Sequence, residues 1–187
     1  MANVDASFGL RPVRHLGGGQ LRTRKFSIAS GYSTSIFKGD VVELTGADDN
    51  VALAAAGNGD NLGVFWGCRY VDATGSVVFG KYWPASTTAT EIEAYVFVDP
   101  LIVYAVQGDG TDAAANVGEL ADFIYTNAGN TTTGISGAEL DTSTVAATGG
   151  SLRILGLAPY EGNAWGDNAV MEVQIAEHAL IQIGAEV

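Results

Sequence analysis

The sequence is short of the residues that build disulfides and metal centres. Its 187 residues contain one cysteine, Cys68, and two histidines, His15 and His178. A single cysteine excludes an intrachain disulfide framework and a multi-cysteine metal site, and zinc or cupin-like centres use more histidines than this chain provides. Neither histidine is spaced for a Ser-His-Asp triad, and a structural hydrogen bond is the favoured role of His178. We therefore expect no metal and no cofactor.

Long apolar runs and a secretory leader are also missing. No stretch approaches the ~20 apolar residues that span a bilayer. The N-terminus lacks the basic start, apolar stretch and cleavage site of a signal peptide. Hydrophobic residues nevertheless make up 47% of the chain, which is ample for a core. These features predict synthesis in the cytoplasm and no membrane contact.

Charge is scarce and unevenly placed. Charged residues make up 16% of the chain, against roughly 25% in ordinary soluble domains. The net charge of −12 argues against nucleic-acid binding, because phosphate contacts need clustered Lys and Arg. Residues 1–38 hold six of the nine basic residues and one acid, whereas residues 39–187 hold three bases and 20 acids. The sequence thus predicts a basic N-terminal segment joined to an acidic body.

The first 23 residues are expected to form an extended N-terminal arm. Pro12 and the glycine run 17–19 interrupt helix and strand patterns. Apolar side chains lie among the basic ones, which a purely solvated tail would seldom carry; a disordered terminus is the alternative. We predict that the arm binds a partner protein or a neighbouring subunit through six residues, Phe8, Leu10, Arg11, Arg14, Arg22 and Arg24.

From residue 24 onward, short apolar runs alternate with turn clusters, and residues 92–98 show the two-residue period of a strand. Residues 108–151 are rich in Gly, Thr and Ala and are expected to form a long-loop region, with 119–126 a strand in preference to a short helix. The pattern predicts one all-β domain over 24–187, a β-sandwich or barrel that is jelly-roll-like or β-tulip-like. The expected strands are 25–29, 40–45, 51–56, 62–71, 77–83, 91–98, 101–107, 119–126, 152–157 and 169–176, with 178–183 as a further edge.

Few side chains could carry catalysis. Glu91 and Glu93 share one face of an expected strand and could serve a glycosidase, but solvated strand positions are the simpler interpretation. The turns at 108–112 and 58–61 offer oxygens for calcium. Neither fits an EF-hand loop, and Asp, Asn and Gly are typical of tight turns. The protein is therefore expected not to be an enzyme.

Both ends of the chain resemble a group of small tailed-phage structural proteins. These proteins begin with an Ala-Asp-Ala-Pro-Phe-Gly-Leu-Arg-Pro-type stretch, and residues 2–14 read ANVDASFGLRPVR. Residues 173–178 read VQIAEH, where the group usually has Asn-Glu-His, so that Ala176 replaces the Asn. Further similar stretches lie at 135–143, 152–157 and 163–168.

This resemblance is to the head decoration, or cement, proteins. It implies a protein without a catalytic site that binds the major capsid protein on the outer surface of the virion, as a homotrimer. An arm that orders on contact and the repeated contacts of a homo-oligomer suit that role. The alternative is a tail or fibre-base protein whose Trp66, Trp83 or Trp165 contacts a host glycan or receptor. A third hypothesis is that the protein is a polysaccharide-degrading enzyme built on a β-sandwich.

Overall fold

The computed structural model of the chain describes residues 3–46, 48–57 and 59–181. Within these ranges it contains two short 3-10 helices, Ala114–Asn116 and Thr142–Thr144, and no α-helix. The all-β prediction is confirmed. In chain order the strands are β1 (Arg11–His15), β2 (Thr23–Phe26), β3 (Val41–Leu44), β4 (Val51–Leu53), β5 (Asn61–Asp72), β6 (Val77–Gly80), β7 (Ala89–Phe97), β8 (Ile102–Gln107), β9 (Thr111–Asp112), β10 (Leu120–Ala121), β11 (Phe123–Ile124), β12 (Glu139–Leu140), β13 (Leu152–Leu157), β14 (Gly166–Asp167) and β15 (Val170–Ile175).

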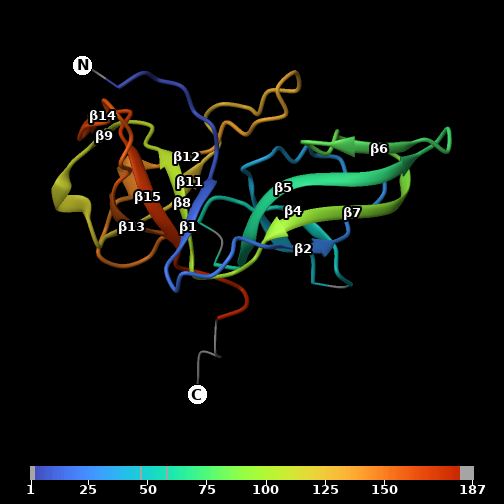
Figure 1. The fold of residues 1–187 in the computed structure, drawn as a ribbon, viewed down its shortest axis with the longest axis horizontal. Helices are drawn as coiled ribbons and strands as arrows, with labels where there is room; N and C mark the ends of the chain where they lie inside the picture. Colours follow the sequence, from blue (N-terminus) through green and yellow to red (C-terminus); the bar gives the residue numbers. More distant parts are fainter. Residues whose placement is uncertain (1–2, 47, 58, 182–187) are drawn as a thin grey trace.

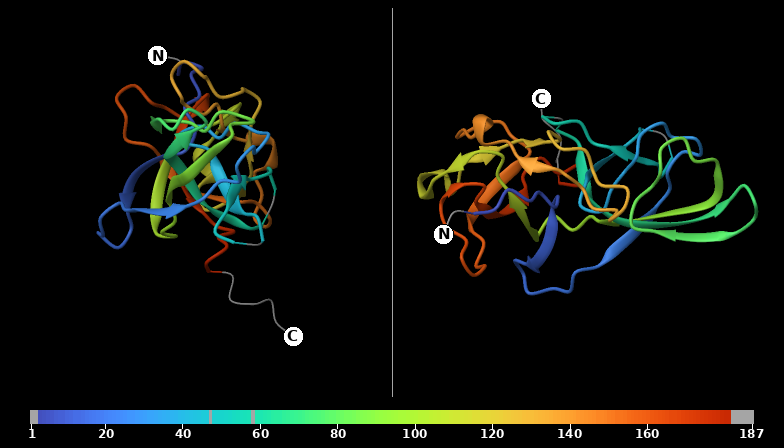
Figure 2. Two further views of the ribbon diagram at one scale, coloured as in Figure 1. Left: turned by 90° about the vertical axis from the view of Figure 1, so that its right-hand side faces the viewer. Right: turned by 90° about the horizontal axis from the view of Figure 1, so that it is seen from above.

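Two antiparallel sheets form the two halves of the molecule, which lie side by side along its long axis (Figures 1 and 2). The first sheet has the order β1-β8-β15-β13-β10. The second has the order β2-β7-β5-β3-β4, and β6 pairs with the C-terminal part of β5. Two small two-stranded sheets, β11-β12 and β14-β9, lie beside the first sheet (Figure 1).

The second sheet is buried on both faces where it meets the first half. Val41 of β3 and Val64 of β5 pack in the core of the first half. The residues that follow them, Val42 and Phe65, pack in the core of the second half. Because successive side chains of a strand point to opposite faces, β3 and β5 serve both cores. The two halves therefore share one wall, and neither core is complete without it.

Most of the predicted strands are present, with ends shifted by a few residues. The run 119–126 is divided into β10 and β11 at Asp122, whose Oδ1 accepts hydrogen bonds from the Ser151 backbone N–H at 3.0 Å and Oγ at 3.2 Å. The expected edge at 178–183 contains no strand as far as residue 181, and residues 182 and 183 lie outside the described part of the chain.

The N-terminal segment belongs to the first sheet. β1 pairs antiparallel with β8, and Leu10, just before it, is fully buried in the first core. Pro12 is tolerated because β1 is an edge strand, where a missing backbone donor breaks no ladder bond on the open side. An arm separate from the body is not confirmed, and neither is a jelly-roll-like or β-tulip-like topology.

Candidate functional site

The first described residues lie against the body and are held there by side-chain hydrogen bonds. Asn3 Nδ2 donates to the Ala164 carbonyl at 2.8 Å, and the Ala164 N–H donates to Asn3 Oδ1 at 3.2 Å. Gln107, buried at the end of β8, accepts from the Ala6 N–H at 2.8 Å and donates to the Val4 carbonyl at 2.9 Å. The chain thus reaches β1 along a fixed path.

Three of the six predicted contact residues lie together at the start of β1. Leu10 points into the first core with no exposed surface. Its side chain therefore packs within its own chain and is not available to a partner. Phe8 is half-buried. The exposed guanidinium of Arg11 lies over the Phe8 ring, with 4.6 Å between Cζ and the ring centroid. This pair remains available at the surface.

The other three are dispersed. Arg14 forms an ion pair with Glu172 of β15, with 2.6 Å between Nη2 and Oε2. Arg22 precedes β2 and Arg24 lies on it, and both are exposed. Since β2 is an edge strand of the second sheet, these two arginines form a basic rim apart from Phe8 and Arg11.

A tight backbone crossing joins the N-terminal segment to the second half. The Leu10 N–H donates to the Gly39 carbonyl at 2.9 Å. Gly9 has a φ of +70°, in the left-handed region that favours glycine, and a Cβ there would lie 2.6 Å from Cβ of Ser136. The glycine of the Phe-Gly-Leu-Arg stretch is therefore required by both its conformation and the close approach.

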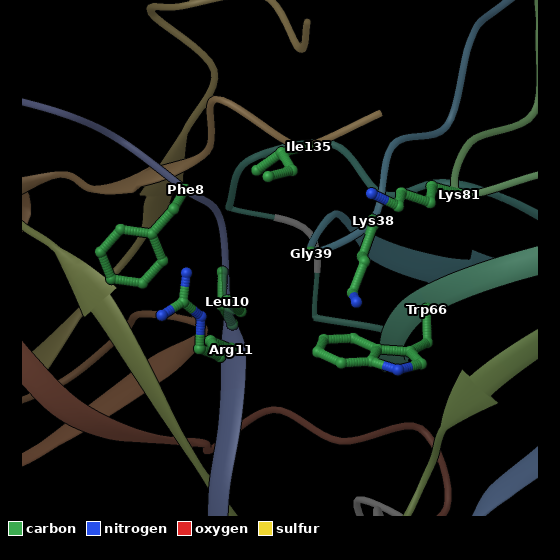
Figure 3. A pocket seen from close by; sticks show the side chains of 8 residues that line it. All are labelled: Phe8, Leu10, Arg11, Lys38, Gly39, Trp66, Lys81 and Ile135. Carbon is green, nitrogen blue, oxygen red and sulfur yellow. The ribbon is translucent and has the colours of Figure 1, made fainter. Parts of the chain in front are cut away.

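A pocket of about 350 Å³ opens beside this crossing (Figure 3). We call it the seam pocket. Lys38 comes from the segment before β3, Trp66 from β5, and Lys81 from the segment after β6. In Figure 3 the Lys38 side chain points toward the Trp66 ring, whereas the Lys81 side chain points toward the Ile135 side of the pocket. The lining residues are Phe8, Leu10, Arg11, Lys38, Gly39, Trp66, Lys81 and Ile135.

The seam pocket is strongly cationic in an acidic protein. Three of the nine basic residues of the chain line it. Within the described ranges, Arg11, Lys38 and Lys81 form no ion pair with a carboxylate. Burial lowers the pKa of Lys38, and the nearby Lys81 and Arg11 lower it further. The Trp66 ring partly stabilises the positive charge of Lys38, because the Lys38 Nζ lies 3.7 Å from the centroid of that ring. Such an arrangement can bind an anionic group.

The three tryptophans differ in access. Trp83 is fully buried in the second core, so it cannot stack on a glycan in this conformation. Trp165 is half-buried and packs against the first core. Trp66 lines the seam pocket, but Lys38 covers one part of its ring. Phe97 packs edge-on against the same ring, with 5.2 Å between the two ring centroids.

The two glutamates considered for glycoside hydrolysis are both ion-paired. Glu91 contacts Arg69 at 3.2 Å, and Glu93 contacts Lys25 at 2.9 Å. The hydrogen bond from Lys25 lowers the pKa of Glu93, and one from Tyr95 adds to this. A general acid in a glycosidase needs a raised pKa, so the environment of Glu93 opposes that role.

In the first turn considered for calcium, at 108–112, Asp109 uses one carboxylate oxygen internally, whereas the buried Asp112 Oδ2 has no hydrogen-bond partner among the described residues. Asp109 Oδ1 accepts from the N–H and the hydroxyl of Thr142, both at 2.9 Å. Burial raises the pKa of Asp112 to about 6, and Asp112 Oδ1 accepts a hydrogen bond from Asn116 Nδ2 at 3.2 Å. Asn58 of the second turn lies outside the described residues. In the part of the chain that the structure describes, no three His, Cys, Asp or Glu side chains cluster as a metal site would require.

Both histidines have local structural partners. His15 Nδ1 accepts from the N–H groups of Gly17 and Gly19 at 3.0 and 3.1 Å, while Nε2 lies 3.1 Å from Asp99 Oδ2. The buried His178 accepts from the Leu180 N–H at 3.1 Å, which is the structural role expected of it.

Sequence reasoning did not identify Lys38, Lys81 and Trp66 as one site. Lys81 is one of only three basic residues after position 38, and this rarity is the signal that could have singled it out. The position of Lys81 near Trp66 depends on the β5–β6 register, in which Cys68 pairs with Gly80, and leaves no local pattern in the sequence.

No protein-family model, curated protein or solved structure matches the chain. None of the helices in the described ranges has the length and apolar character that a bilayer crossing requires.

Proposed function

We propose that this chain is a capsid decoration protein, a structural protein that binds the outside of a tailed-phage head as a homo-oligomer and bridges neighbouring capsid subunits. The observation that carries the proposal is a set of basic side chains that form no ion pair with the described acids of an acidic chain. Arg11, Lys38 and Lys81 lie beside the N-terminal stretch that resembles decoration proteins, and Arg22 and Arg24 form the separate β2 rim. In this proposal the body is a sandwich-like clamp, and the exposed side chains of residues 3–25 face the shell.

Three physical effects support binding to the shell: faster association, a fixed orientation and multivalent contact. Arginines and lysines presented to shell carboxylates would speed association and fix its orientation. Each copy in an oligomer repeats the contact, so weak single sites become tight binding when several engage together. Binding to the assembled shell alone stabilises that state by mass action.

The experiment is a binding assay on undecorated heads. Wild-type protein is expected to saturate the heads, and Arg22→Gln/Arg24→Gln protein to show an occupancy reduced by about tenfold or more at the same concentration, because each removed charge weakens the encounter and the contact. Occupancy should also fall as salt rises, since exposed charges are screened over about 10 Å at 0.1 M. Deleting residues 1–23 is a poor test, because it removes Leu10 from the core and β1 from the sheet.

Arg153→Gln is the matched control, an exposed cation on β13 in the other half. Unchanged occupancy of the double variant would remove the β2 rim from the mechanism. No binding of the wild type to heads would overturn the proposed function.

A second function, glycan or receptor binding in a tail or fibre base, is favoured by one observation. Trp66 is half-buried in a cationic pocket, an arrangement that could hold an acidic sugar. The cover that Lys38 places on the Trp66 ring favours the first proposal. Copy number separates them: hundreds of copies per particle support decoration, whereas a dozen or fewer, with glycan binding lost in Trp66→Ala, support the tail role.

A further inference from the structure

We infer that the seam pocket binds the carboxylate side chain of a protein segment, an aspartate or glutamate supplied from outside the chain. The inference rests on the proposed function for the source of that segment, which is the shell protein or a second copy of this chain. It goes beyond that function by naming the group that is recognised and the residues that hold it.

The first argument is the uncompensated charge. Arg11, Lys38 and Lys81 line one pocket, and like charges held close together repel one another. The chain has 21 acidic residues, yet none of the described ones forms an ion pair with these three. A chain with acids in excess that leaves this cluster unpaired has kept its charge available to an incoming anion.

The second argument is the composition of the wall. Phe8, Trp66 and Ile135, which are half-buried, line the pocket together with the cations. A hydrated inorganic anion gains nothing from such apolar surface. An aspartate or glutamate has an aliphatic stem that can lie against it while the carboxylate meets the ammonium groups. The volume of about 350 Å³ accommodates a side chain with bound water.

The third argument is that two of the three cations are held in place. The position of Lys38 over Trp66 restrains its side chain, and Arg11 is restrained by its stack on Phe8. Gly39, at the base of the pocket, is fixed by two hydrogen bonds of 2.9 Å, one accepted from Leu10 and one donated to the Phe65 carbonyl. Donors that are ordered before the ligand arrives lose less entropy on binding.

The test uses the full chain and a capped peptide, acetyl-Gly-Glu-Gly-Glu-Gly-amide, titrated while the Trp66 indole N–H is followed by NMR. The matched peptide carries Gln in place of Glu, and inorganic phosphate is a separate arm. We expect the Glu peptide to shift the Trp66 signal saturably and the Gln peptide to bind at least tenfold more weakly. Lys81→Gln should weaken Glu-peptide binding by at least fivefold, and Arg153→Gln by less than twofold.

Lys81 is exposed, so its substitution is expected to leave the fold intact; a thermal unfolding midpoint equal to that of the wild type checks this. Equal binding of the two peptides, or equal effects of Lys81→Gln and Arg153→Gln, would overturn the inference. The inference would also be overturned if phosphate displaced the Glu peptide and bound at a lower concentration than the peptide. That result would indicate a general anion site.

Two further measurements identify the source of the carboxylate. Loss of the oligomer in Lys81→Gln, measured by sedimentation without heads, assigns it to a second copy; loss of head occupancy with an intact oligomer assigns it to the shell. If Lys81→Gln changes neither, the inference is overturned. Wild-type protein that decorates heads but binds no Glu peptide refutes the inference alone. Protein that binds the peptide but not heads refutes the proposed function alone.

Discussion

The backbone N–H of Leu10 donates a hydrogen bond to the carbonyl of Gly39 at 2.9 Å, and this contact joins the N-terminal segment to the strand system of the second half. Leu10 itself fills the first core. The N-terminal stretch is therefore part of the fold as well as of the proposed binding surface. Stability measurements on variants of this stretch are therefore needed before a loss of binding is assigned to the binding surface.

Leu10→Ala is expected to lower the free energy of unfolding by about 2–5 kcal/mol, because it leaves a cavity in a core where the side chain has no exposed surface. Urea unfolding followed by circular dichroism measures this. Leu16→Ala is the control: Leu16 is 46% exposed, and its truncation should change stability by less than about 0.5 kcal/mol. Equal effects of the two substitutions would show that residue 10 is not packed in solution.

Gly9→Ala and Gly18→Ala form a second matched pair. Both glycines have φ near +70°, so both substitutions carry the left-handed penalty of about 1–2 kcal/mol. An added Cβ meets Ser136 at Gly9 but nothing within 4 Å at Gly18. Gly9→Ala should therefore be more destabilising by at least about 1 kcal/mol, as expected for overpacking. Thermal or urea unfolding compares the two, and identical losses would contradict the crossing at Gly39.

Asp40 should make stability fall as the pH rises. Burial raises its folded pKa to about 6, although hydrogen bonds from Ser136 and the Phe37 N–H act in the opposite direction. Because the unfolded carboxyl releases its proton near pH 3.9, the folded state binds the proton more tightly. The contribution of Asp40 is fully present below about pH 3.9 and is lost as the pH rises through about 6. At most about 3 kcal/mol is involved.

Asp40→Asn removes this titration. The variant should be more stable than the wild type at pH 7, with a difference that vanishes near pH 4, as measured by urea unfolding across that range. Asp72→Asn is the contrasting control, because hydrogen bonds from Thr74 and the Ser76 N–H lower the pKa of Asp72. Its contribution is therefore lost as the pH falls. If the free energy of unfolding of Asp40→Asn fell with pH as steeply as that of the wild type, another group would be responsible for the titration.

His15→Ala is expected to make the glycine run at residues 17–19 more mobile. The ring accepts from two backbone N–H groups of residues 17 and 19 and meets Asp99 on its other side. Losing these bonds should lower stability by about 1–2 kcal/mol and speed amide hydrogen exchange at Gly17 and Gly19. Arg22→Ala, which removes a side chain bonded only to Gln20 in this segment, should leave those two amides unchanged. Unchanged exchange in His15→Ala would mean that the loop is held by other contacts.

The sequence by itself determined the all-β class, most of the strands and the absence of disulfides. Strand formation at β7 and β15 follows the two-residue period of the sequence, which is local and can be read directly. The division between a basic first fifth and an acidic remainder is likewise a property of the sequence alone.

The tertiary structure decided what the N-terminal stretch does. Pro12 and the glycines indicated an arm, but an edge position tolerates proline, and burial of Leu10 draws the stretch into the first core. The seam pocket joins residues 11, 38, 66 and 81. Contacts at such separations depend on how strands pair and on which face of a shared wall each side chain lies, and neither is recorded in the local order of residues.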